Sequence, residues 1–242
     1  MASYQNKDNA SLDMYTYSID KVIADLKSSG FSKLPSIRHL IKKNKYFDMY
    51  KDERVLSTYR ENSIAHLNLI KDMDLESLFD ALYAHGKELK LRVKHEDKYF
   101  ISRYVKNGEV SEGFRGHFDS HFITIVLPVC IPDGGERFTN GELFVMPNFR
   151  GHVSNEAINI FQKIYSKMLN NEKTYLDLLK IGKASLLDFK DYEPFVFYGN
   201  RTFHGNFPLL KSNSDRLTFI CHLYDTSPRF GIGALLRKLR NR

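Results

Sequence analysis

The feature that most limits how this chain can fold is an apolar run at residues 122–131, with the sequence Phe-Ile-Thr-Ile-Val-Leu-Pro-Val-Cys-Ile. β-Branched and aromatic residues favour a strand, and the Pro-Asp-Gly-Gly sequence that follows at 132–135 is typical of a turn. The run is shorter than the roughly 20 apolar residues that a membrane-spanning helix needs. It therefore predicts the clearest strand in the chain.

The spacing of apolar residues divides the rest of the chain into a helical first part and a β-rich second part. Helical spacing occurs at 13–29, 37–41, 64–70, 74–89 and 154–180. Strand-like segments occur at 99–105, 142–146, 195–199 and 217–224. We therefore expect one α+β, mainly β domain over 1–242. Its parts would be a helical layer (1–97), a β-sandwich or small barrel (98–225) with a helical insertion (154–180), and a basic tail (226–242).

Charge and composition exclude some classes of function. The net charge of the 242 residues is +7, but four of the seven charges come from the last eleven residues, 232–242. Because the excess charge is not spread over the domain, we expect no nucleic-acid partner. The start of the chain is polar and has no apolar signal segment, which predicts a cytoplasmic protein. The tail is amphipathic at 235–240 and is either a solvated helix or a weak contact with an anionic membrane surface.

A His-x-Asp motif, His117 and Asp119, stands directly before the apolar run. On a strand, residues two apart face the same side, so both side chains could reach one metal ion. The same spacing occurs at His95 and Asp97, but there it lies in a charged segment, 92–98, that is typical of a solvated turn. The adjacent strand therefore favours the His117 motif.

Two later residues complete a recognisable set. His204 would add a second imidazole to His117 and Asp119, and two histidines with one carboxylate leave positions open on a non-haem Fe(II) ion. Arg216 follows twelve residues after His204. Its guanidinium could hold a carboxylate of an acidic co-substrate by two parallel hydrogen bonds.

With these residues the chain resembles the 2-oxoglutarate and Fe(II)-dependent dioxygenases, over roughly residues 98–225. The resemblance implies a double-stranded β-helix, or jelly roll. It implies that His117, Asp119 and His204 bind Fe(II), and that Arg216 and Thr218 bind the distal carboxylate of 2-oxoglutarate. Tyr104, on the strand before the motif, is similar in position to residues that also reach the co-substrate in that family.

The function that this resemblance implies is hydroxylation of an unactivated carbon, using O2 and 2-oxoglutarate and releasing succinate and CO2. The basic charge favours a small acidic molecule, a sugar acid or a glycolipid as substrate. The order of helices and strands is similar to the phytanoyl-type and sugar-acid hydroxylase branches. The alternative is a jelly-roll protein that binds a metal or ligand without turnover, for which a carboxylate-binding Arg216 has no use. The sequence makes no prediction about the oligomeric state.

Overall fold

The computed structural model describes residues 15–52, 59–132, 136–152, 165–210 and 214–226. Its named helices are α1 (Ile19–Ser29), α2 (Arg38–Asn44), α3 (Tyr46–Asp52), α4 (Ile64–Asp72), α5 (Glu76–Glu88) and α7 (Glu172–Lys180). Its strands are β1 (Phe31–Lys33), β2 (Tyr59–Glu61), β3 (Lys98–Val105), β4 (His121–Cys130), β5 (Leu143–Met146), β6 (Ser185–Leu187), β7 (Phe195–Tyr198), β8 (Phe203–Asn206) and β9 (Arg216–Asp225). In this part of the chain no helix is long and apolar enough to cross a membrane.

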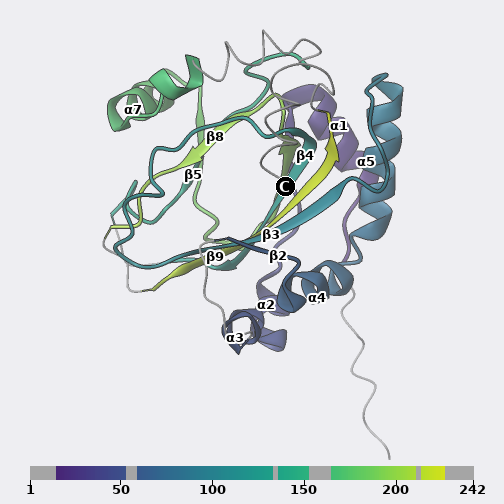
Figure 1. Ribbon diagram of the computed structural model, residues 1–242, viewed down its shortest axis with the longest axis horizontal. Coiled ribbons are helices and arrows are strands. Elements are labelled where there is room, and N and C mark those ends of the chain that lie inside the picture. The colour runs from purple at the N-terminus through teal and green to yellow at the C-terminus, as the bar shows by residue number, and fades with distance from the viewer. Residues whose placement is uncertain (1–14, 53–58, 133–135, 153–164, 211–213, 227–242) are drawn as a thin grey trace, which may run out of the picture.

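The strands form two antiparallel sheets. The larger sheet has the order β1-β7-β4-β9-β3-β2, and the smaller sheet has the order β6-β5-β8. The apolar run predicted from the sequence is β4, which lies between β7 and β9 near the centre of the larger sheet. In Figure 1 the smaller sheet lies apart from helices α1 to α5, with the larger sheet between them.

A helical layer covers the outer face of the larger sheet. Helices α1, α3, α4 and α5 pack there, and their buried side chains share one core with those of β4 and β9 (Figure 1). Helix α7 packs instead beside the smaller sheet, where Tyr175 stacks on Phe144 with 4.0 Å between ring centroids. The two sheets thus hold a space between them that neither helical group fills.

The helical first part follows the sequence prediction with two differences. The predicted helix at 13–29 begins only at Ile19, because the Ser18 side chain accepts a hydrogen bond from the backbone N–H of Lys21 and caps the helix. The first part also supplies both edge strands of the larger sheet, β1 and β2.

The predicted helical insertion is only partly described. Residues 165–168 are helical and α7 begins after Asn171, whose side chain caps it. The first part of the predicted helix, 154–164, and nearly all of the basic tail, 227–242, lie outside the described residues.

His66 is a buried histidine in the core between α4 and the larger sheet. It is fully buried, its ring stacks on Phe219 with 4.7 Å between centroids, and its Nε2 lies 3.4 Å from the Sγ of Cys221. Burial, with a smaller contribution from the charge of His222, lowers the pKa of His66 to about 3. The imidazole is therefore neutral in the folded protein over most of the acidic range.

We expect His66 to make the fold sensitive to acid. The unfolded chain binds a proton at His66 below about pH 6.5, whereas the folded chain does not until about pH 3, so stability falls as the pH falls between these values. Between pH 7 and pH 5 the wild type should lose about 2 kcal/mol more unfolding free energy than His66→Gln. Urea unfolding at both pH values measures the difference, with the exposed His39→Gln as control. Equal losses in wild type and His66→Gln would contradict the prediction.

Candidate metal centre

His117 and His204 are joined through the main chain. They form an isolated antiparallel bridge, with backbone N-to-O distances of 2.8 and 3.1 Å between the two residues. The sequence predicted that His117 and Asp119 lie on the strand that continues into the apolar run. Instead β4 begins only at His121, and His117 extends the smaller sheet next to β8.

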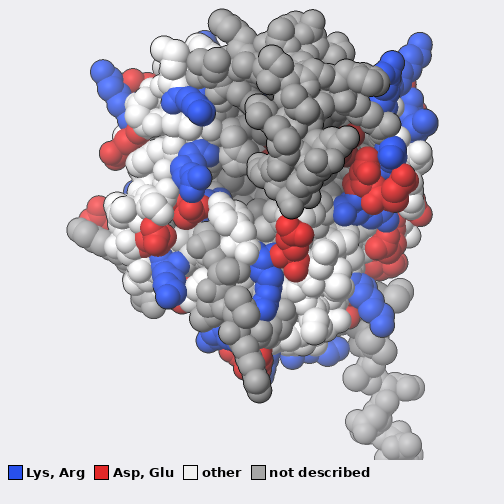
Figure 2. All heavy atoms as spheres, viewed as in Figure 1, with Lys and Arg blue, Asp and Glu red and all other residues white. Residues whose placement is uncertain are grey.

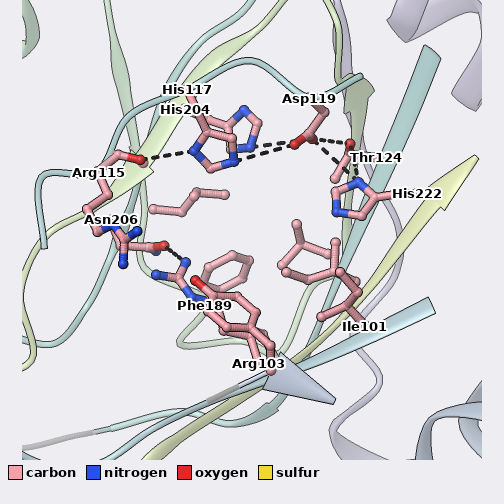
Figure 3. Close-up of a pocket in the computed structure, with 16 residues that line it drawn as sticks. Ile101, Arg103, Arg115, His117, Asp119, Thr124, Phe189, His204, Asn206 and His222 are labelled. Carbon is pink, nitrogen blue, oxygen red and sulfur yellow. Dashed lines mark hydrogen bonds and ion pairs between the residues drawn. The ribbon is translucent and has the colours of Figure 1, made fainter. Parts of the chain in front are cut away.

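The three side chains expected to bind a metal converge. Asp119 Oδ1 lies 3.4 Å from His117 Nε2, and Asp119 Oδ2 lies 3.5 Å from His204 Nε2. One possible ligand atom from each residue lies within 4.8 Å of the other two. Figure 3 shows both imidazoles pointing toward the Asp119 carboxylate. This geometry allows a single small cation to contact all three residues.

The other nitrogen of each imidazole is already held. His117 Nδ1 lies 2.9 Å from the carbonyl of Arg115, and His204 Nδ1 lies 3.1 Å from the carbonyl of Thr202. A carbonyl only accepts, so both Nδ1 atoms carry a hydrogen and donate. In a neutral imidazole the lone pair is then on Nε2, facing the carboxylate, and two acceptors that face each other require a proton or a cation between them. The donor set therefore fits a divalent metal with an open coordination sphere.

The pKa shifts of His117, Asp119 and His204 agree with a cation-binding site at this position. Burial alone would raise the pKa of Asp119, but the nearby His204, His222 and His117 outweigh it and hold that pKa well below its usual range. Burial, opposed by the charge of Asp119, lowers the pKa of His204 to about 4. Burial also lowers the pKa of His117, but the hydrogen bond and the charge of Asp119 outweigh burial and raise that pKa. Asp119 therefore favours the protonated form of His117.

A cavity of about 100 Å³ opens beside these residues, between the two sheets. Its walls combine polar side chains near the metal ligands with an apolar side. The apolar wall is formed by Ile101, Val126, Leu143, Phe189 and Ile220. Such a mixed cavity suits a small molecule with polar groups at its ends.

The residues expected to bind the co-substrate lie in different places. Thr218 lines the cavity, and Arg216 is on the same face of β9, two residues earlier. Arg216 is 3% exposed, and its Nη1 donates to the carbonyl of Gly141. Tyr104 faces the helical side of the sheet, where its hydroxyl donates to Asp215. The structure brings Thr218 to the cavity and places Tyr104 away from it.

Arg216 is a buried cation with no carboxylate partner among the residues that the structure describes. It forms no ion pair within the described ranges, and its Nε is buried without a hydrogen-bond partner there. Burial and the nearby charge of Arg103 lower the pKa of Arg216 to about 9. A buried cation of this kind is costly unless an anion pairs with it. Arg216 itself is not among the residues that line the cavity, although Thr218 on the same face of β9 is.

Two arginines that sequence reasoning did not select also line the cavity. Arg103, opposite Thr218 in the β3–β9 pairing, is bound by Asn206 and by the Glu112 carboxylate at 2.8 Å. Arg115 binds the other oxygen of Glu112 at 2.7 Å and is 62% exposed. The two guanidinium groups share one carboxylate, so one positive charge is left over at this side of the cavity.

The smaller sheet and the His117 segment approach closely because glycines face each other. A Cβ added to Gly205 would lie 2.8 Å from the Cα of Gly116 and 2.5 Å from the hydroxyl of Tyr175. Contacts this short are not tolerated between real Cβ atoms and backbone. Gly205 and Gly116 therefore allow the bridge between His117 and His204 to form.

Replacing Gly205 with alanine is expected to separate the two ligand-bearing segments. Overpacking of this kind destabilises a core by about 1–3 kcal/mol, and the shifted His204 should also weaken metal binding. Denaturant unfolding and Zn(II) titration measure the two effects. Gly151→Ala is the matched control, because no atom of the described residues lies within 4 Å of its added Cβ. Unchanged stability and Zn(II) affinity in Gly205→Ala would contradict the prediction.

Comparison with solved structures supports the same architecture. A prolyl-4-hydroxylase from Pseudomonas putida superposes with a TM-score of 0.53 at 13% identity, covering 87% of this chain and all of that one. This chain therefore shares the fold of that prolyl-4-hydroxylase. EvdO2 from Micromonospora carbonacea var. aurantiaca, solved with 2-oxoglutarate, is similar with a TM-score of 0.49 at 14% identity over 88% of this chain and 96% of that one. No protein-family model and no curated protein matches the sequence.

The face of the molecule seen in Figure 2 has no large patch of a single charge sign among the described residues. On the side seen in Figure 2, basic and acidic side chains of the described residues lie next to one another. The His117, Asp119 and His204 group is thus the chemically distinctive feature of the described chain.

Proposed function

We propose that this protein is a 2-oxoglutarate- and Fe(II)-dependent oxygenase that hydroxylates an unactivated carbon of an acidic small molecule, sugar acid or glycolipid. The observation that carries the proposal is the convergence of His117, Asp119 and His204 with both Nδ1 atoms already bonded to carbonyls. The two antiparallel sheets, with the site between them, support a double-stranded β-helix.

In this proposal His117, Asp119 and His204 hold Fe(II). Bound Fe(II) supplies the oxidative chemistry, in which one atom of O2 enters the substrate, the other enters succinate, and CO2 is released from 2-oxoglutarate. The protein's part is to hold the metal by three ligands, to keep both imidazoles in the correct tautomer, and to orient the co-substrate.

We assign the distal carboxylate of 2-oxoglutarate to Arg216, with Thr218 contributing its hydroxyl. The buried, unpaired guanidinium of Arg216 supports this assignment, because a carboxylate would complete its hydrogen bonds and balance its charge. Arg103 lies opposite Thr218 and lines the cavity, whereas Tyr104, which was expected to reach the co-substrate, does not. The hydroxyl of Tyr104 is bound to Asp215, and we assign it no contact with the co-substrate.

The acidic character of the substrate is supported by the cavity wall. Arg115 is largely exposed there and shares Glu112 with Arg103. Asp119 is the one carboxylate that lines the cavity among the described residues, and the metal would neutralise it. An anionic group on the primary substrate would therefore meet a net positive wall.

The decisive experiment is anaerobic addition of Fe(II) and then 2-oxoglutarate, followed by visible absorption. We expect a weak charge-transfer band that requires both additions, and its absence in the wild type would contradict the proposal. Succinate release in air, measured against panels of acidic, neutral and cationic compounds, then tests turnover and substrate class. A jelly-roll protein that binds metal without turnover would bind Fe(II) but release no succinate with any compound.

A further inference from the structure

A third histidine, His222, stands beside the proposed metal ligands without being one of them. It lies on the cavity face of β9, and its Nδ1 is 3.6 Å from Asp119 Oδ2. The same Nδ1 is 3.2 Å from the hydroxyl of Thr124 on β4. Figure 3 shows Asp119, Thr124 and His222 as one connected group on the far side of the carboxylate from the two other imidazoles.

The number of hydrogens available fixes the direction of these bonds. The hydroxyl of Thr124 has one hydrogen, and it donates this hydrogen to Asp119 Oδ2, which only accepts. Toward His222 the hydroxyl oxygen must then act as acceptor, so His222 Nδ1 must carry a hydrogen. The chain of bonds runs from His222 Nδ1–H to the Thr124 hydroxyl and on to the Asp119 carboxylate.

The backbone leaves room for this arrangement. A Cβ at Gly199 would overlap the hydroxyl of Thr124 and would lie 3.1 Å from the Cβ of Asp119. The carbonyl of Gly199 also accepts a hydrogen bond of 3.1 Å from the backbone N–H of Asp119. Main chain and side chains therefore both determine where the Asp119 carboxylate lies.

The ring of His222 is itself held in place. It stacks on His121 with 5.1 Å between ring centroids and on Tyr99 with 6.4 Å. These contacts restrict rotation of the imidazole, so the Nδ1–H keeps its direction toward Thr124 and Asp119. A donor that is fixed by packing loses little entropy when it forms its hydrogen bond.

We propose that His222 and Thr124 are positioning residues that orient Asp119 as a metal ligand through an Nδ1–H to hydroxyl to carboxylate relay. The proposal rests on the proposed function, because it assigns a task to the same metal site. Partners that orient a metal ligand in this way are worth about 10–100-fold in metal affinity. With Nδ1 protonated, Nε2 of the neutral ring is an acceptor, so a substrate group that reaches it must be a hydrogen-bond donor.

The tautomer of His222 can be measured directly. Long-range ¹H–¹⁵N spectra of the metal-free and Zn(II)-loaded protein should show a protonated-type shift for Nδ1 and an unprotonated-type shift for Nε2. The signals are assigned by their loss in His222→Asn. A neutral ring with its hydrogen on Nε2 would overturn the relay. This measurement does not depend on metal binding, so it decides the relay even if the metal site itself is wrong.

Matched variants then test the effect on the metal. Asparagine places its amide N–H₂ near the position of Nδ1, whereas glutamine places it near Nε2, so His222→Asn keeps the donor and His222→Gln does not. We expect His222→Gln and Thr124→Val to weaken Zn(II) binding about 10–100-fold, and His222→Asn and Thr124→Ser to stay within about threefold of wild type. Unfolding of each metal-free variant shows whether it is folded.

The outcomes separate the two proposals. If wild type binds no Zn(II) or Fe(II), the proposed function fails. If wild type binds metal but asparagine and glutamine at position 222 have equal effects, the metal site stands and the relay is wrong. A difference in Zn(II) affinity between the two amides, together with the expected tautomer, would support the relay, since a purely structural role of His222 predicts no such difference.

Discussion

Asp119→Ala should lower the affinity for Fe(II) by more than about 100-fold, because loss of even an outer partner of a metal ligand costs 10–100-fold. The carboxylate is the only anionic group among the three converging residues, and both imidazole Nε2 atoms lie 3.4–3.5 Å from its oxygens. Without it two neutral imidazoles remain. Anaerobic Fe(II) titration and Mn(II) binding followed by electron paramagnetic resonance both measure the loss.

The chain supplies its own control for this prediction. His95 and Asp97 repeat the His-x-Asp spacing, but His95 is half exposed and bonds Asp80 instead of a metal-site partner. Asp97→Ala should therefore leave Fe(II) affinity unchanged. His204→Gln provides a second ligand variant, so that a folding defect in Asp119→Ala alone does not decide the result. Wild-type affinity in both folded ligand variants would place the metal elsewhere.

Arg216→Met should weaken the binding of 2-oxoglutarate without lowering the unfolding free energy of the protein. Removing a charged partner of a buried ion pair costs about 2–5 kcal/mol of binding, so the affinity for 2-oxoglutarate should fall at least about 30-fold. In the ligand-free protein the guanidinium is buried without an ion pair in the described ranges, so an apolar side chain should leave the unfolding free energy unchanged or raise it. Calorimetric titration of the Zn(II)-loaded protein and urea unfolding measure the two quantities.

Arg103→Met is the matched comparison. Arg103 is paired with the buried Glu112, so its removal leaves a carboxylate with fewer partners and should cost about 1–3 kcal/mol of stability. If Arg216→Met is destabilised to the same degree and binds 2-oxoglutarate like wild type, then Arg216 has a structural role and the carboxylate assignment is wrong.

His117 and Asp119 can be predicted as metal ligands from the sequence because they lie two residues apart and directly before a recognisable strand. The apolar run at 122–131 identifies β4. The residue types and the spacing of His117 and Asp119 indicate metal binding. His204 lies 85 residues after Asp119, so its approach depends on the pairing of β8 with β5 and with the His117 segment. No local pattern specifies that pairing, and 203–206 was not recognised as a strand.

The side of a strand that faces the cavity was harder to predict. Moving one residue along a strand reverses the face, and the segment containing Arg103 and Tyr104 has no strict alternation of polar and apolar residues to fix it. The register with β9 decides the matter, because Arg103 lies opposite Thr218 and Tyr104 lies opposite Leu217. The sequence analysis selected Tyr104 on this strand, whereas its neighbour Arg103 is the residue that lines the cavity.

The backbone bridge between His117 and His204 ties assembly of the site to completion of the fold. The bridge joins the segment before β4 to β8, which is made much later in the chain. A chain in which β8 has not yet docked has only one imidazole and one carboxylate in place. Under the proposed function, a metal ion can therefore contact all three ligands only after β8 has paired with the His117 segment.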